Sequence, residues 1–288
     1  MVAIRNLVLL FIVTQLAPSP STAGASLYAS DRANPPHTSL FAQSAAEILN
    51  REFPDDTISF LLIDIPSGRV LASRWDNLEA PIPLGSLVKP FTALAYGEHH
   101  AFLFPAHVCR GTATGCWRPH GHGAVDLPTA IAYSCNSYFR VLTETMTTAD
   151  VAPTAVRFGL EPPAPETAGP VLAGLGDRWL ISPLSMAHAY LELIHRRDQP
   201  GVRQILAGMA QSAEKGTGAE VDRALPFPAL VKTGTAACTH SKRARGDGFA
   251  VAIAPSDDPQ ILLMVRVHGV PGALAAKVAG QMLRSVKE

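Results

Sequence analysis

Three short clusters along the 288-residue chain carry side chains that can act together as a nucleophile and its base. The first is Ser86 and Lys89, three positions apart at the start of a stretch with helical periodicity. Residues three apart share one face of a helix, so the lysine can reach the serine hydroxyl. A serine is a weak nucleophile until a base takes its proton. A lysine can do so once burial or a second cation lowers its pKa. Taken alone, the pair equally fits an ordinary helix start, with Ser86 as the cap and Lys89 in solvent.

The other two clusters lie further along the chain. Ser134 and Asn136 form a Ser-x-Asn, which alone is typical of a polar patch that satisfies local backbone groups. The third cluster is Lys232, Thr233, Gly234 and Thr235, within a β-rich stretch. A glycine inside a strand often marks the close approach of a ligand or of another backbone. A lysine and two hydroxyls beside that glycine suit an anionic carboxylate, whereas the alternative is an edge strand with a surface lysine.

Hydrophobic periodicity predicts the elements that must position these clusters. Helices are expected over residues 39–51, 86–99, 127–145, 182–195 and 274–286, and strands over 57–64, 69–75, 229–237, 248–254 and 260–268. Two strands come early and three late, and strands so separated can share one antiparallel sheet. The sequence therefore predicts an α+β fold with a helical lobe inserted into the sheet lobe. A ligand cleft is expected where the two lobes meet.

The predicted domain organisation follows from this pattern. Residues 39–288 are expected to form one domain, with a sheet lobe at about 39–78 and 225–288 and a helical lobe at about 79–224. Lys plus Arg and Asp plus Glu both number 24, which argues against a nucleic-acid binder because such a protein needs a basic surplus. The hydrophobic content of 47% excludes an intrinsically disordered chain.

The N-terminus has the pattern of an export signal. Arg5 precedes an apolar run from Leu7 to Leu16, and small residues follow, with a cleavage site after Ala25. Residues 1–25 are thus predicted to be a signal peptide and residues 26–38 a flexible leader. The apolar run is short of the ~20 residues that span a bilayer comfortably. The protein is expected to be exported to the periplasm, either cleaved or held at the inner membrane by an uncleaved N-terminus.

An oxidising compartment permits disulfides between the four cysteines, Cys109, Cys116, Cys135 and Cys238. The first two lie close together in a glycine-rich loop and are the predicted pair. The alternative is four independent buried thiols. A zinc site would add His120 and His122 to the first two cysteines, but their spacing matches no compact structural zinc pattern. No metal site is therefore expected.

The three clusters occur in the order Ser-x-x-Lys, Ser-x-Asn, Lys-Thr-Gly, which resembles the trio of penicillin-binding proteins and serine β-lactamases. Cys135 stands where the trio usually has Asp. The resemblance to penicillin-binding proteins covers roughly residues 55 to 285 and extends to longer stretches. These are GSLVKPFTALA from Gly85, GHGAVDLPTAIAYSCNSYF from Gly121, GLGDRWLISPLSMAHAY from Gly174, KGTG from Lys215 and VKTGTA from Val231. The resemblance implies a five-stranded antiparallel sheet flanked by helices, plus a helical lobe.

The resemblance also implies roles for the residues of the trio. Ser86 would be the nucleophile, Lys89 its base, and Ser134 the relay that protonates the leaving amine. Asn136 would bind the substrate amide, and the Lys232–Thr235 segment, including Thr233 and Gly234, its terminal carboxylate. The oxyanion hole would be the backbone N–H groups of Ser86 and Thr235. The implied substrates are peptidoglycan stem peptides ending in D-Ala-D-Ala, and β-lactams would react at the same serine. No metal or organic cofactor is implied, and the resemblance leaves protein partners in the cell wall open.

Two rival functions share this apparatus. A serine β-lactamase must also hydrolyse the acyl-enzyme, and a sensor or wall-binding protein acylates without turnover. Class A β-lactamases resemble this chain in the trio but supply a Glu for deacylation, in a Glu-x-x-Leu-Asn motif that this sequence lacks. Glu161 and Glu166 lie in the right interval, among prolines, and are expected to be solvent-facing loop carboxylates. The carboxylated lysine of class D β-lactamases leaves a second route open, through Lys89.

Overall fold

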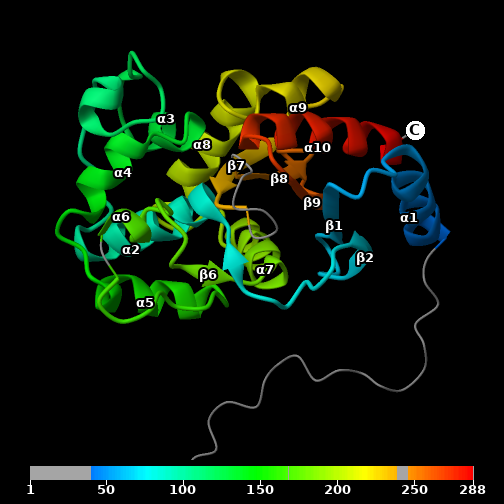
Figure 1. The fold of residues 1–288 in the computed structure, drawn as a ribbon, viewed down its shortest axis with the longest axis horizontal. Helices are drawn as coiled ribbons and strands as arrows, with labels where there is room; N and C mark the ends of the chain where they lie inside the picture. The colour runs from blue at the N-terminus through cyan, green and yellow to red at the C-terminus, as the bar shows by residue number, and fades with distance from the viewer. Residues whose placement is uncertain (1–39, 168, 239–245, 288) are drawn as a thin grey trace, which may run out of the picture. The chain divides into compact units, whose positions relative to one another are not determined.

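The computed structural model describes residues 40–167, 169–238 and 246–287 (Figure 1). Within them, five strands form one antiparallel sheet in the order β2-β1-β9-β8-β7. The strands are β1 (Ile58–Asp64), β2 (Val70–Arg74), β7 (Leu230–Ala236), β8 (Asp247–Ala254) and β9 (Ile261–Val267). This confirms the predicted α+β class and the sharing of one sheet by early and late strands. The predicted signal peptide and leader lie outside the described residues.

Both faces of the sheet are covered by helices. Side chains of a strand alternate between the faces, and here apolar side chains point to both of them. Phe60 and Leu62 belong to a core with α1 (Leu40–Glu52) and α10 (Gly272–Lys287), whereas Leu61 and Ile63 belong to a second core on the opposite face. That second core includes residues of α7 (Pro183–His195). In Figure 1, α10 runs along the sheet on the side of α9 (Ala219–Ala224), and α7 lies on the other side.

The helical elements between β2 and β7 carry the first two clusters. They are η1 (Gly85–Val88), α2 (Lys89–His99), η2 (Gly111–Thr114), α3 (Leu127–Ala132), α4 (Asn136–Thr143), α5 (Thr148–Arg157), α6 (Gly169–Leu172), α7, α8 (Val202–Lys215) and α9. Two small antiparallel pairs accompany them: β3 (Ile82–Pro83) with β6 (Leu180–Ile181), and β4 (His107–Cys109) with β5 (Gly123–Val125). Among the described residues, no helix combines the length and the apolar character needed to cross a membrane.

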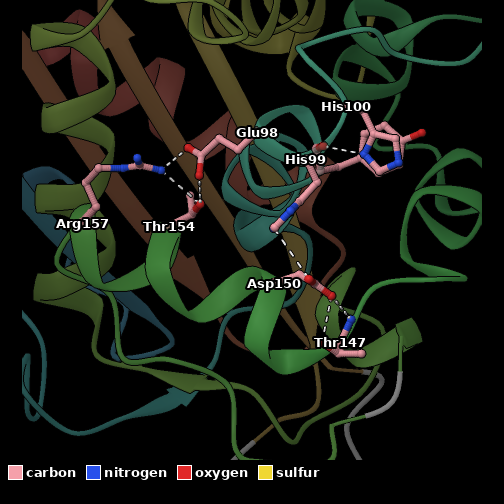
Figure 2. Close-up of polar contacts among 8 residues, drawn as sticks. Glu98, His99, His100, Thr147, Asp150, Thr154 and Arg157 are labelled. Atoms are coloured by element: carbon pink, nitrogen blue, oxygen red, sulfur yellow. Dashed lines mark hydrogen bonds and ion pairs between the residues drawn. The ribbon is translucent and has the colours of Figure 1, made fainter.

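Polar contacts hold α5 against the end of α2, the helix that begins with Lys89 (Figure 2). Glu98 on α2 accepts a hydrogen bond of 3.0 Å from the Thr154 hydroxyl and pairs with Arg157, both on α5. His99 lies 3.6 Å from a carboxylate oxygen of Asp150, and that carboxylate also accepts from the backbone N–H of Thr147 at the start of α5. These contacts support α2 at the end far from its first residue.

One predicted helix is wrong in its continuity. The stretch 127–145 is two helices, α3 and α4, separated by a break whose centre is Ser134. Ser134 has a left-handed backbone with φ of +49°, which costs on the order of 1–3 kcal/mol for a residue other than glycine. Thr217 donates from its backbone N–H to the carbonyl of Ala132 at 3.1 Å, so a distant segment takes the acceptor that would have continued α3. The break is therefore set by tertiary contacts.

Candidate active site

Ser86 lies in the 3₁₀ helix η1, and Lys89 is the first residue of α2. Side chains three apart eclipse one another in a 3₁₀ helix, so the predicted shared face holds, although the helix type differs. Pro90 suits the first turn of α2 because the N–H that it lacks has no partner there. The hydroxyl of Tyr190, on α7, donates to the carbonyl of Leu87 at 2.9 Å and thereby holds η1 against α7. Ser86 is half-buried, while Lys89 is fully buried.

The ammonium of Lys89 is surrounded by oxygen atoms of the second cluster. Its Nζ donates to the Ser134 carbonyl at 2.9 Å and to Asn136 Oδ1 at 2.7 Å, and it lies 3.4 Å from the Ser134 hydroxyl. The left-handed turn at Ser134 is what directs that carbonyl towards the lysine. Burial lowers the pKa of Lys89 to about 7. The alternative of a helix-start lysine in solvent is excluded, and the side chain is equipped to act as a base near neutral pH.

Lys232 of β7 reaches the same point from the sheet. Its side chain is fully buried, and its Nζ donates to the Ser134 hydroxyl at 3.0 Å and to the Thr233 carbonyl at 2.6 Å. Burial, and secondarily the charge of Lys89, holds the pKa of Lys232 well below its usual range. The Ser134 hydroxyl therefore lies between the amino groups of two buried lysines. The three clusters, separated by up to 146 positions in sequence (86 to 232), meet at this hydroxyl and at the cleft that Ser86 lines.

The hydroxyls of the third cluster are held in different ways. Thr233 Oγ1 lies 2.6 Å from Thr217 Oγ1, which belongs to the KGTG stretch from Lys215. Thr235 Oγ1 accepts from the backbone N–H of Gly272, the first residue of α10, at 2.9 Å. Thr235 is exposed and lines the cleft, so it remains positioned for a ligand while it also anchors the start of α10.

Glycines allow the backbones of η1 and β7 to come close together. β7 lies at one edge of the sheet, and an added Cβ on Gly234 would lie 2.6 Å from the carbonyl oxygen of Leu84. Gly85 has φ of +56°, and its Cβ would overlap the carbonyl of Thr235. The predicted close approach at Gly234 is thus confirmed, and the approaching group is a backbone. It brings the segments that hold the proposed N–H donors, Ser86 and Thr235, next to each other.

A substitution at Gly85 tests this contact. Gly85→Ala is expected to lower the free energy of unfolding by the ~1–2 kcal/mol of a left-handed residue plus about 1–3 kcal/mol of overpacking. Gly159→Ala is the matched control, since Gly159 also has a positive φ of +72° but nothing within 4 Å of its Cβ. Urea unfolding of both variants checks the difference. Equal losses for the two would show that the close contact at Gly85 does not constrain the chain.

The cleft beside these residues has a volume of about 480 Å³, within the usual range for small-molecule sites. Its lining includes six of the predicted residues, Ser86, Ser134, Asn136, Thr233, Gly234 and Thr235. Lys89 and Lys232 lie behind this lining. Sequence reasoning missed other lining residues, namely Trp117, Arg140, Gly174, Leu175, Gly176, Thr217, Pro271, Gly272 and Ala273. Arg140 was within reach of prediction, because it follows Asn136 by one helical turn on α4.

Two expectations about side chains near the site are wrong. Cys109 and Cys116 are free thiols, so the predicted disulfide is not formed. Glu161 is half-buried and not solvent-facing: its Oε1 accepts from the Ser182 backbone N–H and the Ser185 hydroxyl, each at 3.3 Å, at the start of α7. Glu166 is exposed, as expected. Neither carboxylate lines the cleft.

Comparison with known proteins places this arrangement in a family. The model of the penicillin-binding protein transpeptidase domain matches residues 58–287. No curated protein matches the sequence. Among solved structures, PBP2 of Pseudomonas aeruginosa is 19% identical, with a TM-score of 0.71 over 86% of this chain and 73% of that one. The transpeptidase domain of Burkholderia pseudomallei penicillin-binding protein 3 is 18% identical, with a TM-score of 0.63 over 87% and 92%.

A third structure is a complex of PBP2 from Helicobacter pylori with MreC. Its PBP2 is 16% identical, with a TM-score of 0.73 over 85% of this chain. This chain spans 62% of that PBP2, so the comparison concerns only part of the longer protein. At such identities these structures show the shared fold. The family model covers most of the sequence and all three clusters, and the chain therefore belongs to the penicillin-binding protein transpeptidase domain family.

Proposed function

We propose that the chain is a penicillin-binding serine D,D-transpeptidase or D,D-carboxypeptidase that acts on peptidoglycan stem peptides through an acyl-enzyme on Ser86. The observation that carries the proposal is the position of the Ser134 hydroxyl. It lies 3.0 Å from Lys232 Nζ and 3.4 Å from Lys89 Nζ, at a cleft that Ser86 lines. A buried lysine with a lowered pKa beside a serine is the arrangement that activates a hydroxyl nucleophile.

Acylation begins with the proton of Ser86. A neutral lysine has two N–H bonds and one lone pair on its nitrogen. The two shortest hydrogen bonds of Lys89 Nζ go to acceptors, the Ser134 carbonyl and Asn136 Oδ1. With both N–H bonds directed there, the lone pair is left for the Ser86 hydroxyl. Ser86 Oγ then forms a bond to the carbonyl carbon of the penultimate D-Ala, and the C–N bond to the terminal D-Ala breaks.

The leaving amine must receive a proton as that bond breaks. The Ser134 hydroxyl can donate one and be reprotonated by either adjacent lysine, so it serves as the relay. The developing oxyanion would be bound by the backbone N–H groups of Ser86 and Thr235, which the crossing of η1 and β7 brings together. In the second step an amine of another stem peptide, or water, takes the acyl group and releases Ser86.

The charge of the cleft favours an anionic substrate. Arg140 lines it, and none of the described residues that line it is a carboxylate. A stem peptide ends in a carboxylate, and a β-lactam carries one beside its reactive ring. Thr233 and Thr235 would bind that group, and the amide N–H of Asn136 would bind the substrate's amide. The proposal includes export to the periplasm, where this polymer lies, and leaves open a wall-associated protein partner of the kind seen in the MreC complex.

The acyl-enzyme formed with a β-lactam is expected to persist. Deacylation needs a base that activates a water beside the ester, and neither Glu161 nor Glu166 lines the cleft. A carbamate on Lys89 would place its oxygens against two acceptors, the Ser134 carbonyl and Asn136 Oδ1, so the class D route is also disfavoured. Nitrocefin should therefore give one stoichiometric burst and then almost no turnover, with or without bicarbonate.

Stopped-flow absorbance checks this, and intact mass should show one penicilloyl group per chain. Sustained turnover would instead identify a β-lactamase, and its dependence on bicarbonate would point to Lys89. Release of D-Ala from a stem pentapeptide distinguishes the enzyme from a sensor. Acylation by penicillin without any reaction on stem peptides, alone or with an amine acceptor, would favour the sensor.

A further inference from the structure

Three cysteines and one histidine converge beside the active site. Cys109 ends β4, Cys116 follows η2, His122 directly precedes β5, and Cys135 caps the start of α4. One ligand atom from each, three Sγ and one imidazole nitrogen, lie within 4.8 Å of one another. The zinc site weighed from the sequence had His120 as its fourth ligand and did not include Cys135. Cys135 lies 13 positions beyond His122, and only the fold brings it to the other three.

The spacing of the four atoms is that of a tetrahedral metal site. Zinc binds sulfur at about 2.3 Å and nitrogen at about 2.0–2.1 Å, so the edges of a tetrahedral site are about 3.8 Å between sulfurs and about 3.5 Å between sulfur and nitrogen. Here Cys116 Sγ lies 3.9 Å from Cys135 Sγ, and His122 Nδ1 lies 3.5 Å from Cys109 Sγ and 3.6 Å from Cys116 Sγ. These separations are far longer than the ~2.05 Å of a disulfide.

The surroundings favour a bound ion over three independent thiols. Cys109, Cys116 and Cys135 are buried, with at most 5% of each exposed. The loop that carries the first two is folded tightly on itself: an added Cβ on Gly111 would overlap the carbonyl of Pro119, and one on Gly121 that of Cys109. Its one helical element is the four-residue η2. A metal can hold such a segment where little local structure does.

We propose that Cys109, Cys116, His122 and Cys135 bind one Zn²⁺ in a closed tetrahedral site that positions the Ser134–Asn136 segment. Three cysteines and one histidine are an established ligand set for structural zinc, and four protein ligands leave no open position for catalysis. Cys135 stands between the two residues of the second cluster. Trp117, next to Cys116, lines the cleft and donates from Nε1 to the Tyr133 carbonyl at 3.1 Å. The ion would thus brace two parts of the cleft wall.

The first test is the metal content of the full chain, purified without a histidine tag. Elemental mass spectrometry should find one zinc per chain in the wild type. The Cys238→Ser variant, which lacks the cysteine outside the cluster, should hold the same amount. Cys116→Ser and His122→Ala should lose most of it. Wild-type protein loaded with Co²⁺ should show the visible bands of tetrahedral cobalt and a thiolate charge-transfer band. X-ray absorption of the wild type should give three sulfurs and one nitrogen, a readout that does not depend on how the variants fold.

The proposed site would be overturned if wild-type protein held no zinc, showed no cobalt bands and had all four thiols free to react. The positioning role rests on the proposed function and has its own readout. Removal of the zinc, or Cys116→Ser, should slow fluorescent-penicillin labelling by about 10–100-fold, while Cys238→Ser labels normally. Labelling that is unchanged after zinc loss would overturn the positioning role. Zinc at one per chain with no labelling of wild-type protein would reject the proposed function and leave the metal site standing.

Discussion

Ser86→Ala is expected to abolish covalent labelling by fluorescent penicillin. The substitution removes the oxygen that the proposed mechanism assigns to the ester, so we expect no slower route through a neighbouring residue. Ser134 lines the same cleft, but its hydroxyl is held between two lysines, and the role proposed for it is that of a relay. Gel fluorescence and intact mass measure the adduct directly, because a penicilloyl group stays attached when the protein is denatured.

A matched control separates chemistry from folding. Ser73 lies exposed on β2 and is not among the residues that line the cleft, so Ser73→Ala should label as the wild type does. Ser86 is half-buried, and among the described residues no hydrogen bond of its side chain supports η1, so Ser86→Ala should also keep the wild-type unfolding midpoint within a few degrees. An Ser86→Ala variant that folds and still forms an adduct would show that the nucleophile is another residue.

Lys89→Met should slow acylation by about 10²–10⁴-fold, the usual contribution of a general base. Methionine has a similar length and fills the buried space, but it cannot take the proton of Ser86. Lys232→Ala should weaken labelling less, because Lys89 remains to activate the nucleophile. Lys277→Met is the control, since Lys277 is exposed on α10. Time courses of penicillin labelling give the second-order rate constant for each variant.

The pH dependence of the wild type follows from the same group. The pKa of Lys89 is lowered to about 7, so the lysine is protonated and inactive below that pH and neutral above it. The acylation rate should therefore rise about tenfold per pH unit below pH 7 and level off above it. The residual rate of Lys89→Met should not show this rise. A wild-type rate that stays flat across pH 7, or a Lys89→Met variant that labels at the wild-type rate, would contradict the role of Lys89 as the base.

The sequence alone determined the five strands of the large sheet and several of the helices, because these follow from local patterns, but it did not predict α5, α8 or α9. A β-rich apolar run predicted β1, and helical periodicity predicted α7 and α10 within one or two residues. The resemblance of the Ser-x-x-Lys, Ser-x-Asn and Lys-Thr-Gly clusters, in that order, to the trio of penicillin-binding proteins predicted which residues meet. Eight residues predicted for the site do lie at or directly behind one cleft.

Tertiary structure alone decided the features that depend on distant partners. The break at Ser134 exists because Lys89 takes its carbonyl and Thr217 takes that of Ala132, and no local pattern between 127 and 145 encodes these contacts. The lowered pKa of Lys89 comes from burial. Burial depends on how distant segments pack, and the Ser-x-x-Lys motif does not reveal it. Cys135 joins Cys109 and His122 for the same reason. A thiol is paired, free or bound to a metal according to which side chains surround it in space, and spacing along the chain does not reveal that.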